Sequence, residues 1–105
     1  MTPLFMHVTI ELKYGKVEGF LETMPKVQAI VESAGWRLEH ALMQVSGKLF
    51  TVRHVWKLRD FAHYAEGMGV FMAHPDFAAL SAALAEVVET ETIAHATALP
   101  YAHNG

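Results

Sequence analysis

The sequence predicts one α+β domain in the split βαβ order, strand–helix–strand followed by strand–helix–strand (βαββαβ). Two observations support this prediction. First, short segments in which apolar and polar residues alternate recur along the chain, as expected for strands with one buried face. Second, longer segments with a one-sided apolar stripe at helical spacing lie between them. At 105 residues, the chain is long enough for a single hydrophobic core.

Composition narrows the possible functions. The formal net charge is −3 with no run of Lys or Arg, which argues against a nucleic-acid binder or a polybasic membrane anchor. There is no cysteine, which excludes disulfides, thiolate nucleophiles and cysteine-ligated metals. No signal peptide or membrane-spanning apolar run is visible, so we expect a cytoplasmic protein. Hydrophobic residues make up 52%, a surplus that a subunit interface would explain.

The first strand is expected at residues 5–13, with Met6, Val8, Ile10 and Leu12 on its apolar face. A helical stripe follows over residues 17–34. Pro25 interrupts this stripe and is expected to kink the helix or divide it into two pieces. Gly35 is expected to cap its C-terminal end.

A hairpin is predicted next, from strands at residues 36–45 and 50–58. The third strand alternates most clearly, with its even-numbered residues from Phe50 to Leu58 on the buried face. Residues opposite each other on paired strands must share a face, and a loop at residues 46–48 satisfies this rule. This register places Leu38 opposite Trp56, His40 opposite His54, and Leu42 opposite Val52.

The second helix is expected to begin after Asp60, a favourable N-cap, and to be broken at His74-Pro75. Pro75 can occupy the first turn of a restarted helix. A fourth strand is expected at residues 90–99, followed by a loose tail at 100–105. The inner face of the second helix is expected to contain Phe61, Tyr64, Ala65, Met68, Phe71 and Met72.

This order is the ferredoxin-like pattern, in which the helices cover one face of the sheet. The opposite face, with Thr9, Glu11, Arg53 and Val55, must then meet water or another subunit. Small residues of the fourth strand make that face self-complementary. We therefore expect a homodimer formed through the sheet faces.

Several motifs together resemble the NIPSNAP group of the dimeric α/β-barrel superfamily. They are Ile10-Glu11-Leu12-Lys13, the helix start at residues 15–20, His54-Val55-Trp56, and His74-Pro75-Asp76-Phe77. The resemblance covers residues 8–100, and its strength comes from the order and spacing of the motifs. Two positions depart from the group's pattern: Ile10 replaces a tyrosine, and His74 stands where an acidic residue is usual.

The resemblance implies a homodimer whose sheets close into a barrel, with a small-molecule pocket between each sheet and its helices. Similar superfamily members include cofactor-free monooxygenases, polyketide cyclases, isomerases and haem-degrading enzymes. The expectation is therefore a small enzyme that needs no cofactor or metal and acts on a hydrophobic aromatic or polyketide-like molecule. The alternative is a non-catalytic module that binds a small molecule or another protein. Fold resemblance does not decide between these two functions.

The candidate site begins with the histidines His40, His54 and His95 on predicted core-facing strand positions. They could be structural, could bind a metal, or could act as acid, base or ligand-orienting groups. Strand spacing separates His54 from His95 by about 9–10 Å, so no metal site is expected. Tyr64 and His74 are similar to the pocket Tyr and His of cyclase-type members, although packing and helix capping would also explain them.

The predicted catalytic residues are His54, His74 and Tyr64. His63 and His103 are expected to be solvated. The predicted substrate-binding residues are the aromatic, methionine and histidine side chains of the inner face, namely Trp56, His40, Met68, Phe71, Phe77 and His95.

Overall fold

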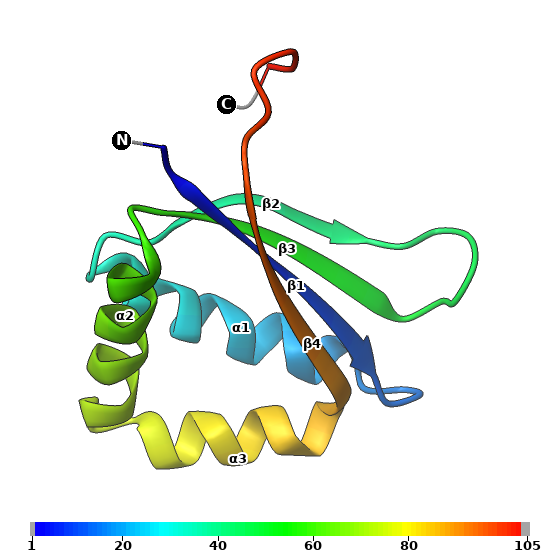
Figure 1. Ribbon diagram of the computed structural model, residues 1–105. Helices are drawn as coiled ribbons and strands as arrows, with labels where there is room; N and C mark the ends of the chain where they lie inside the picture. The colour runs from blue at the N-terminus through cyan, green and yellow to red at the C-terminus, as the bar shows by residue number, and fades with distance from the viewer. Residues whose placement is uncertain (1, 104–105) are drawn as a thin grey trace.

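The structure, a computed structural model, describes residues 2–103 and has the predicted βαββαβ order. The four antiparallel strands lie in the order β2-β3-β1-β4, and the helices lie on one side of the sheet (Figure 1). The α+β, ferredoxin-like class is thus confirmed. The elements are β1 (Leu4–Leu12), α1 (Val17–Glu32), β2 (Arg37–Met43), β3 (Thr51–Leu58), α2 (Phe61–Ala73), α3 (Phe77–Val87) and β4 (Val88–Thr97).

The core lies between the helices and the two central strands, β1 and β3. Burial along β1 alternates, and Met6, Val8 and Ile10 face the helices as predicted. On β3, the even-numbered residues from Val52 to Leu58 are buried on the same inner face, and His54 is among them. Val8 of β1 pairs with His54 of β3 on one side and with Ile93 of β4 on the other, so these three residues lie in one row across the sheet.

Helix α1 runs through Pro25 without dividing, so the prediction of two pieces is wrong. Its end is formed by Gly35, which has a φ of 95° and donates its N–H to the Glu32 carbonyl at 2.9 Å. A positive φ of this size favours glycine. A Cβ at position 35 would also lie 3.1 Å from Nε2 of His63.

The β2–β3 register changes partway along the hairpin. Leu38 pairs with Trp56 as predicted, but His40 pairs with Val55 and Leu42 with Arg53, because the register shifts between Leu38 and His40. An extra residue in one strand reverses the faces of all residues beyond it. The predicted His40–His54 and Leu42–Val52 pairs are therefore wrong, and His40 and Leu42 lie on the outer face.

The loop of this hairpin is longer than predicted. It spans residues 44–50, and the backbone N–H of Gln44 bonds to the Thr51 carbonyl at 2.8 Å. Phe50 lies in this loop with a φ of 61°, not in the strand. The rule that opposite residues share a face assumes regular pairing along the whole hairpin. It therefore could not detect the bulge, which accompanies the longer loop.

The chain breaks between α2 and α3 at His74-Pro75, as predicted, but α3 begins at Phe77 after the N-cap Asp76, so Pro75 does not occupy its first turn. Asp60 caps α2 by accepting the backbone N–H of His63 at 2.9 Å. The buried face of α2 is His63, Gly67 and Phe71, whereas the expected inner residues Phe61 and Met72 are 63% and 57% exposed.

Across residues 2–103, no single helix has the length and apolarity to cross a bilayer. The α2–α3 pair meets that test in composition but is bent by 103°.

Candidate active site between the sheet and the helices

A cavity of about 230 Å³ lies between the inner face of the sheet and the three helices. The strands contribute His54, Trp56 and Glu91, and α2 contributes Tyr64. The rest of its wall is apolar and includes Met6, Val8, Ile10, Met24, Val27, Val31, Trp36, Met68, Phe71, Leu84 and Ile93. A few polar groups converging in an apolar cavity are typical of small-molecule sites.

His54 is 3% exposed and lies between Phe20 and Trp56, each with a ring centroid 6.1 Å from the imidazole. No other residue among 2–103 hydrogen-bonds to its ring in the structure. Burial lowers the pKa of His54, because desolvation disfavours the imidazolium. The cavity therefore contains a neutral imidazole with one N–H donor and one free lone pair.

Tyr64 lies on the α2 side of the cavity, within a continuous aromatic wall. Its ring stacks on Trp36 at 5.7 Å, and Trp36 contacts Trp56 edge-on at 5.5 Å. On the opposite edge, Tyr64 meets the imidazole of His95 at 5.3 Å. The Tyr64 hydroxyl adds an uncharged hydrogen-bond donor to this aromatic wall.

Trp36 takes this position because α2 has a glycine where the indole lies. A Cβ at Gly67 would stand 2.1 Å from Nε1 of Trp36, so no other residue fits without displacing the ring. The same Nε1 donates to the His63 carbonyl at 2.8 Å. Gly67 therefore does more than weaken α2, because it makes room for one wall of the cavity.

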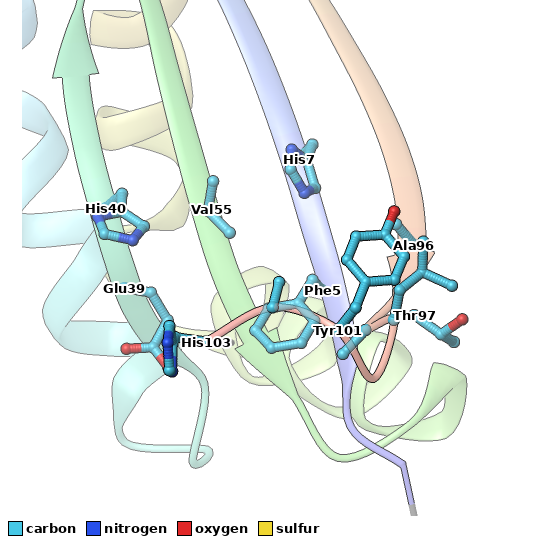
Figure 2. Close-up of a pocket in the computed structure, with 12 residues that line it drawn as sticks. Phe5, His7, Glu39, His40, Val55, Ala96, Thr97, Tyr101 and His103 are labelled. Atoms are coloured by element: carbon cyan, nitrogen blue, oxygen red, sulfur yellow. The ribbon is translucent and has the colours of Figure 1, made fainter. Parts of the chain in front are cut away.

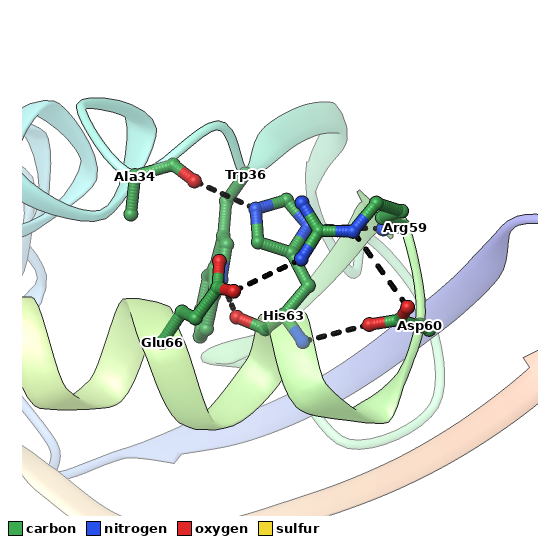
Figure 3. A network of polar contacts seen from close by, with 6 residues as sticks. All are labelled: Ala34, Trp36, Arg59, Asp60, His63 and Glu66. Atoms are coloured by element: carbon green, nitrogen blue, oxygen red, sulfur yellow. Dashed lines mark hydrogen bonds and ion pairs between the residues drawn. The ribbon is translucent and has the colours of Figure 1, made fainter.

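His63 anchors the beginning of α2 (Figure 3), so its predicted solvation is wrong: it is 4% exposed. Its Nδ1 accepts the backbone N–H of Arg59 at 2.9 Å, and its Nε2 lies 2.7 Å from the Ala34 carbonyl. These partners assign the ring proton to Nε2, which then donates to Ala34. His63 was missed because α2 packs its first turn against the chain after α1, which the helical stripe alone does not reveal.

The structure brings together most of the predicted site. His54, Tyr64, Trp56, Met68 and Phe71 all line the cavity. Phe77 packs behind the wall, with its ring 4.9 Å from that of Phe71. His95 lies beside the cavity between Tyr64 and Phe61, and its Nε2 is buried without a partner among residues 2–103.

Two predicted site residues lie elsewhere. His40 is on the outer face of the sheet, because the bulge in β2 reverses its direction. His74 ends α2, and its Nδ1 accepts the backbone N–H of Asp76 at 3.0 Å. Of the two explanations considered for His74, the structure therefore supports helix capping, and His74 does not line the cavity.

Glu91 is a cavity residue that sequence reasoning did not select. It pairs with Ile10 and faces inward from β4, where it lines the cavity and is also exposed to solvent. The apolar side chains around it raise the pKa of the Glu91 carboxyl by desolvation. A signal was present in the sequence, since a charged residue shares the predicted inward face with Ile93 and His95.

A larger hollow of about 530 Å³ lies on the outer face, between the sheet and the chain after β4 (Figure 2). Its wall includes His7, His40 and His103, together with Phe5 and Tyr101. His7, His40 and His103 are exposed. We assign the candidate site to the smaller inner cavity, because both residues with burial-shifted pKa values, His54 and Glu91, line it.

Metal ligation was one explanation considered for the inward histidines. Within residues 2–103, no cluster of three or more His, Asp or Glu side chains is positioned to bind a metal ion. His40 also lies on the opposite face from His54 and His95.

The fold and the cavity together define a ferredoxin-like α+β domain with a small-molecule-sized site between sheet and helices. The chain matches no protein-family model and no curated protein. It is similar to the solved structure of an uncharacterized NIPSNAP domain protein from Burkholderia xenovorans. The TM-score is 0.83 and the identity 22%, over 96% of this chain and 99% of that one.

A NIPSNAP family protein of unknown function from Agrobacterium tumefaciens has a TM-score of 0.84 and 17% identity, covering 96% of this chain and 92% of its own. A more distant neighbour is SnoaB, a cofactor-independent oxygenase from Streptomyces nogalater. Its TM-score is 0.70 and its identity 13%, over 94% of this chain and 95% of its own. The resemblance to NIPSNAP proteins is therefore confirmed at the level of fold.

Proposed function

We propose that this protein is a small enzyme that uses acid–base groups of its own chain on a hydrophobic aromatic or polyketide-like molecule. The inner cavity is the substrate site, and neutral His54 is an acid–base group that bonds to the substrate there. The reaction classes that fit are cyclisation, isomerisation and cofactor-free monooxygenation. SnoaB, a structural neighbour, is a cofactor-independent oxygenase, which supports the last of these classes.

One observation supports this proposal above the others: His54 is buried at a cavity wall and receives no hydrogen bond from another residue among 2–103. Its ring nitrogens are therefore free to bond to a molecule in the cavity, as the few polar groups of an apolar binding site are. With Tyr64 on the facing helix, the imidazole could polarise a carbonyl and move a proton.

We also propose that a second copy of the chain covers the outer face of the sheet. Leu42, turned outward by the bulge, is 55% exposed, and Phe5 and Val55 share that face with the small residues Ala94 and Ala96. Apolar and small residues on an open sheet face suit an interface between sheets.

The first test is native mass spectrometry of protein purified without a metal-affinity tag. We expect a dimer mass, and an added organic mass would identify the ligand class. A monomer would contradict the dimer while leaving the inner cavity intact as a site.

Catalysis is tested with a panel of aromatic and polyketide-like ketones. Binding is followed by the fluorescence of Trp36 and Trp56, and turnover by liquid chromatography with mass spectrometry. His54→Asn should reduce turnover about a hundredfold or more, whereas the matched variant His74→Asn, outside the cavity, should not. The wild-type rate should fall on acidification at a pH lower than the usual histidine pKa, because burial lowers the pKa of His54 and protonation removes its neutral form. Unchanged turnover by His54→Asn would refute the assignment, and binding without any turnover would favour a binding module.

A further inference from the structure

Glu91 occupies a special place in this site, because it borders two hollows at once. It lines the inner cavity and also a neighbouring hollow of about 280 Å³ under α3, which includes Ser81 and Ala85. Ile10, Met24 and Leu84 are common to both walls. Glu91 is the one carboxylate in either wall among residues 2–103, and it is exposed to solvent.

The register places Glu91 at a useful distance from the other polar groups. His54 and Ile93 both pair with Val8, and Glu91 is two residues from Ile93 along β4. Strand geometry thus separates the Cα atoms of His54 and Glu91 by about 10 Å across the sheet and about 7 Å along it. At this separation, a molecule of one or two rings could lie between the His54 and Glu91 side chains and contact both of them.

We propose that Glu91 takes a proton from carbon in the cavity, and that the substrate is an enolisable ketone on an apolar skeleton of one or two rings. This inference rests on the proposed function and assigns its base and its substrate class. The ring system would lie against Trp36 and Trp56, with the carbonyl oxygen toward His54 and Tyr64. The acidic C–H would then point toward Glu91.

The step balances without an oxidant or other co-reactant. The C–H bond beside the carbonyl breaks, and its proton moves to the Glu91 carboxylate. The electron pair forms the enolate, whose oxygen accepts a hydrogen bond from the neutral imidazole N–H of His54 or from the Tyr64 hydroxyl. Return of the proton to the same carbon restores the ketone, and return to a different conjugated carbon gives an isomer.

Chemistry and position support this role together. Desolvation raises the pKa of the Glu91 carboxyl, and a carboxylate that binds its proton more tightly is a stronger base toward carbon. The titratable groups facing the same cavity are His54 from β3 and Tyr64 from α2; from β1, α1 and α3 its wall receives only uncharged side chains. Because Glu91 also reaches solvent, the captured proton can exchange with water between turnovers.

This exchange gives a direct test with β-tetralone, an enolisable aromatic ketone of two rings, as the probe. Full-length protein is incubated with β-tetralone in heavy water, and deuterium uptake next to the carbonyl is followed by NMR. The wild type should accelerate uptake, and Glu91→Gln should reduce the acceleration about a hundredfold or more, with binding measured by tryptophan fluorescence unchanged. Glu91→Asp should restore part of the rate. Glu86→Gln, an exposed glutamate of α3 outside both hollows, should behave as the wild type.

The pH profile separates a base from a residue that merely shapes the wall. The wild-type exchange rate should increase with pH through a titration above the usual carboxyl range, and Glu91→Gln should lack that titration. Exchange that survives in Glu91→Gln but is lost in His54→Asn would overturn this inference and leave the proposed function standing. Binding of β-tetralone without exchange, or no binding, would also overturn it, and the ketone panel would then judge the proposed function separately.

Discussion

Two buried histidines of this fold, His54 and His63, show how differently the same side chain can be used. His63 is 4% exposed, and both of its ring nitrogens have backbone partners, at Arg59 and Ala34. His54 is 3% exposed, yet no residue among 2–103 hydrogen-bonds to it, and it faces a cavity. Two histidines of nearly equal burial therefore differ in their partners, and this difference is the basis of the role proposed for His54.

The two histidines also belong to connected regions. The network around His63 fixes the first turn of α2 through Asp60 and holds the indole of Trp36 through its carbonyl (Figure 3). Trp36 in turn forms the wall on which Tyr64 stacks. The hydrogen-bonded network around His63 therefore supports the cavity wall near His54, and variants in the two regions should have different effects.

The largest expected effect is on the scaffold, at Gly67. The Gly67→Ala variant places a methyl group 2.1 Å from Nε1 of Trp36, so the indole or α2 must move. We expect a loss of about 3 kcal/mol in unfolding free energy, measured by urea denaturation, because overpacking a core is costly. Probe binding in the cavity should weaken as well.

Gly69→Ala is the matched control, because a Cβ there has nothing within 4 Å. It lies on the same helix and should stabilise the protein by up to about 1 kcal/mol, since alanine favours helix. Equal stabilities of the two variants would mean that Trp36 is not held against α2.

The next effect contrasts the two histidines directly. His63→Leu leaves the Arg59 N–H and the Ala34 carbonyl without partners, so we expect a loss of about 2–3 kcal/mol. His54→Leu breaks no hydrogen bond to a residue among 2–103 and keeps an apolar side chain against Phe20 and Trp56, so its unfolding free energy should change by less than about 1 kcal/mol. Activity should follow the reverse order, with His54→Leu inactive even where folded. A large loss of stability in His54→Leu would indicate a structural role and contradict the comparison.

The features of this fold that depend on local sequence patterns could be predicted, whereas those that depend on tertiary packing could not. Alternation placed His54 and Trp56 on the inner face of β3, and the Asp60 cap and the break at Pro75 are local signals that the structure confirms. His40 was misplaced because one extra residue in β2 reverses its face, and the composition of the strand does not reveal it. A regular pattern can be recognised in a sequence, whereas a bulge depends on the loop that closes the hairpin.

The site shows the same limit. Tyr64, Met68 and Phe71 were selected because they repeat at helical spacing, and they line the cavity. His63 was missed because its partners, Ala34 and Arg59, are backbone groups whose approach depends on how α2 packs. Glu91 was missed as a site residue because its importance lies in which hollows it borders, and sequence spacing does not report a cavity.

The smallest effect, and the most specific to His54, is on the pH dependence of stability. Burial lowers the pKa of His54 in the folded protein, so the unfolded chain binds this proton more readily. Wild-type stability should therefore be complete above the unfolded-state pKa of about 6.5 and should decline as pH falls below it. The contribution of His54 has a slope of at most about 1.4 kcal/mol per pH unit in that window.

Glu91, whose pKa is raised, acts in the opposite sense, but it is present in both the wild type and His54→Leu. The difference between their urea unfolding curves from pH 7.5 to 5 therefore isolates His54. Parallel loss of stability in the two proteins would show that His54 is already protonated, or partnered, in the folded state.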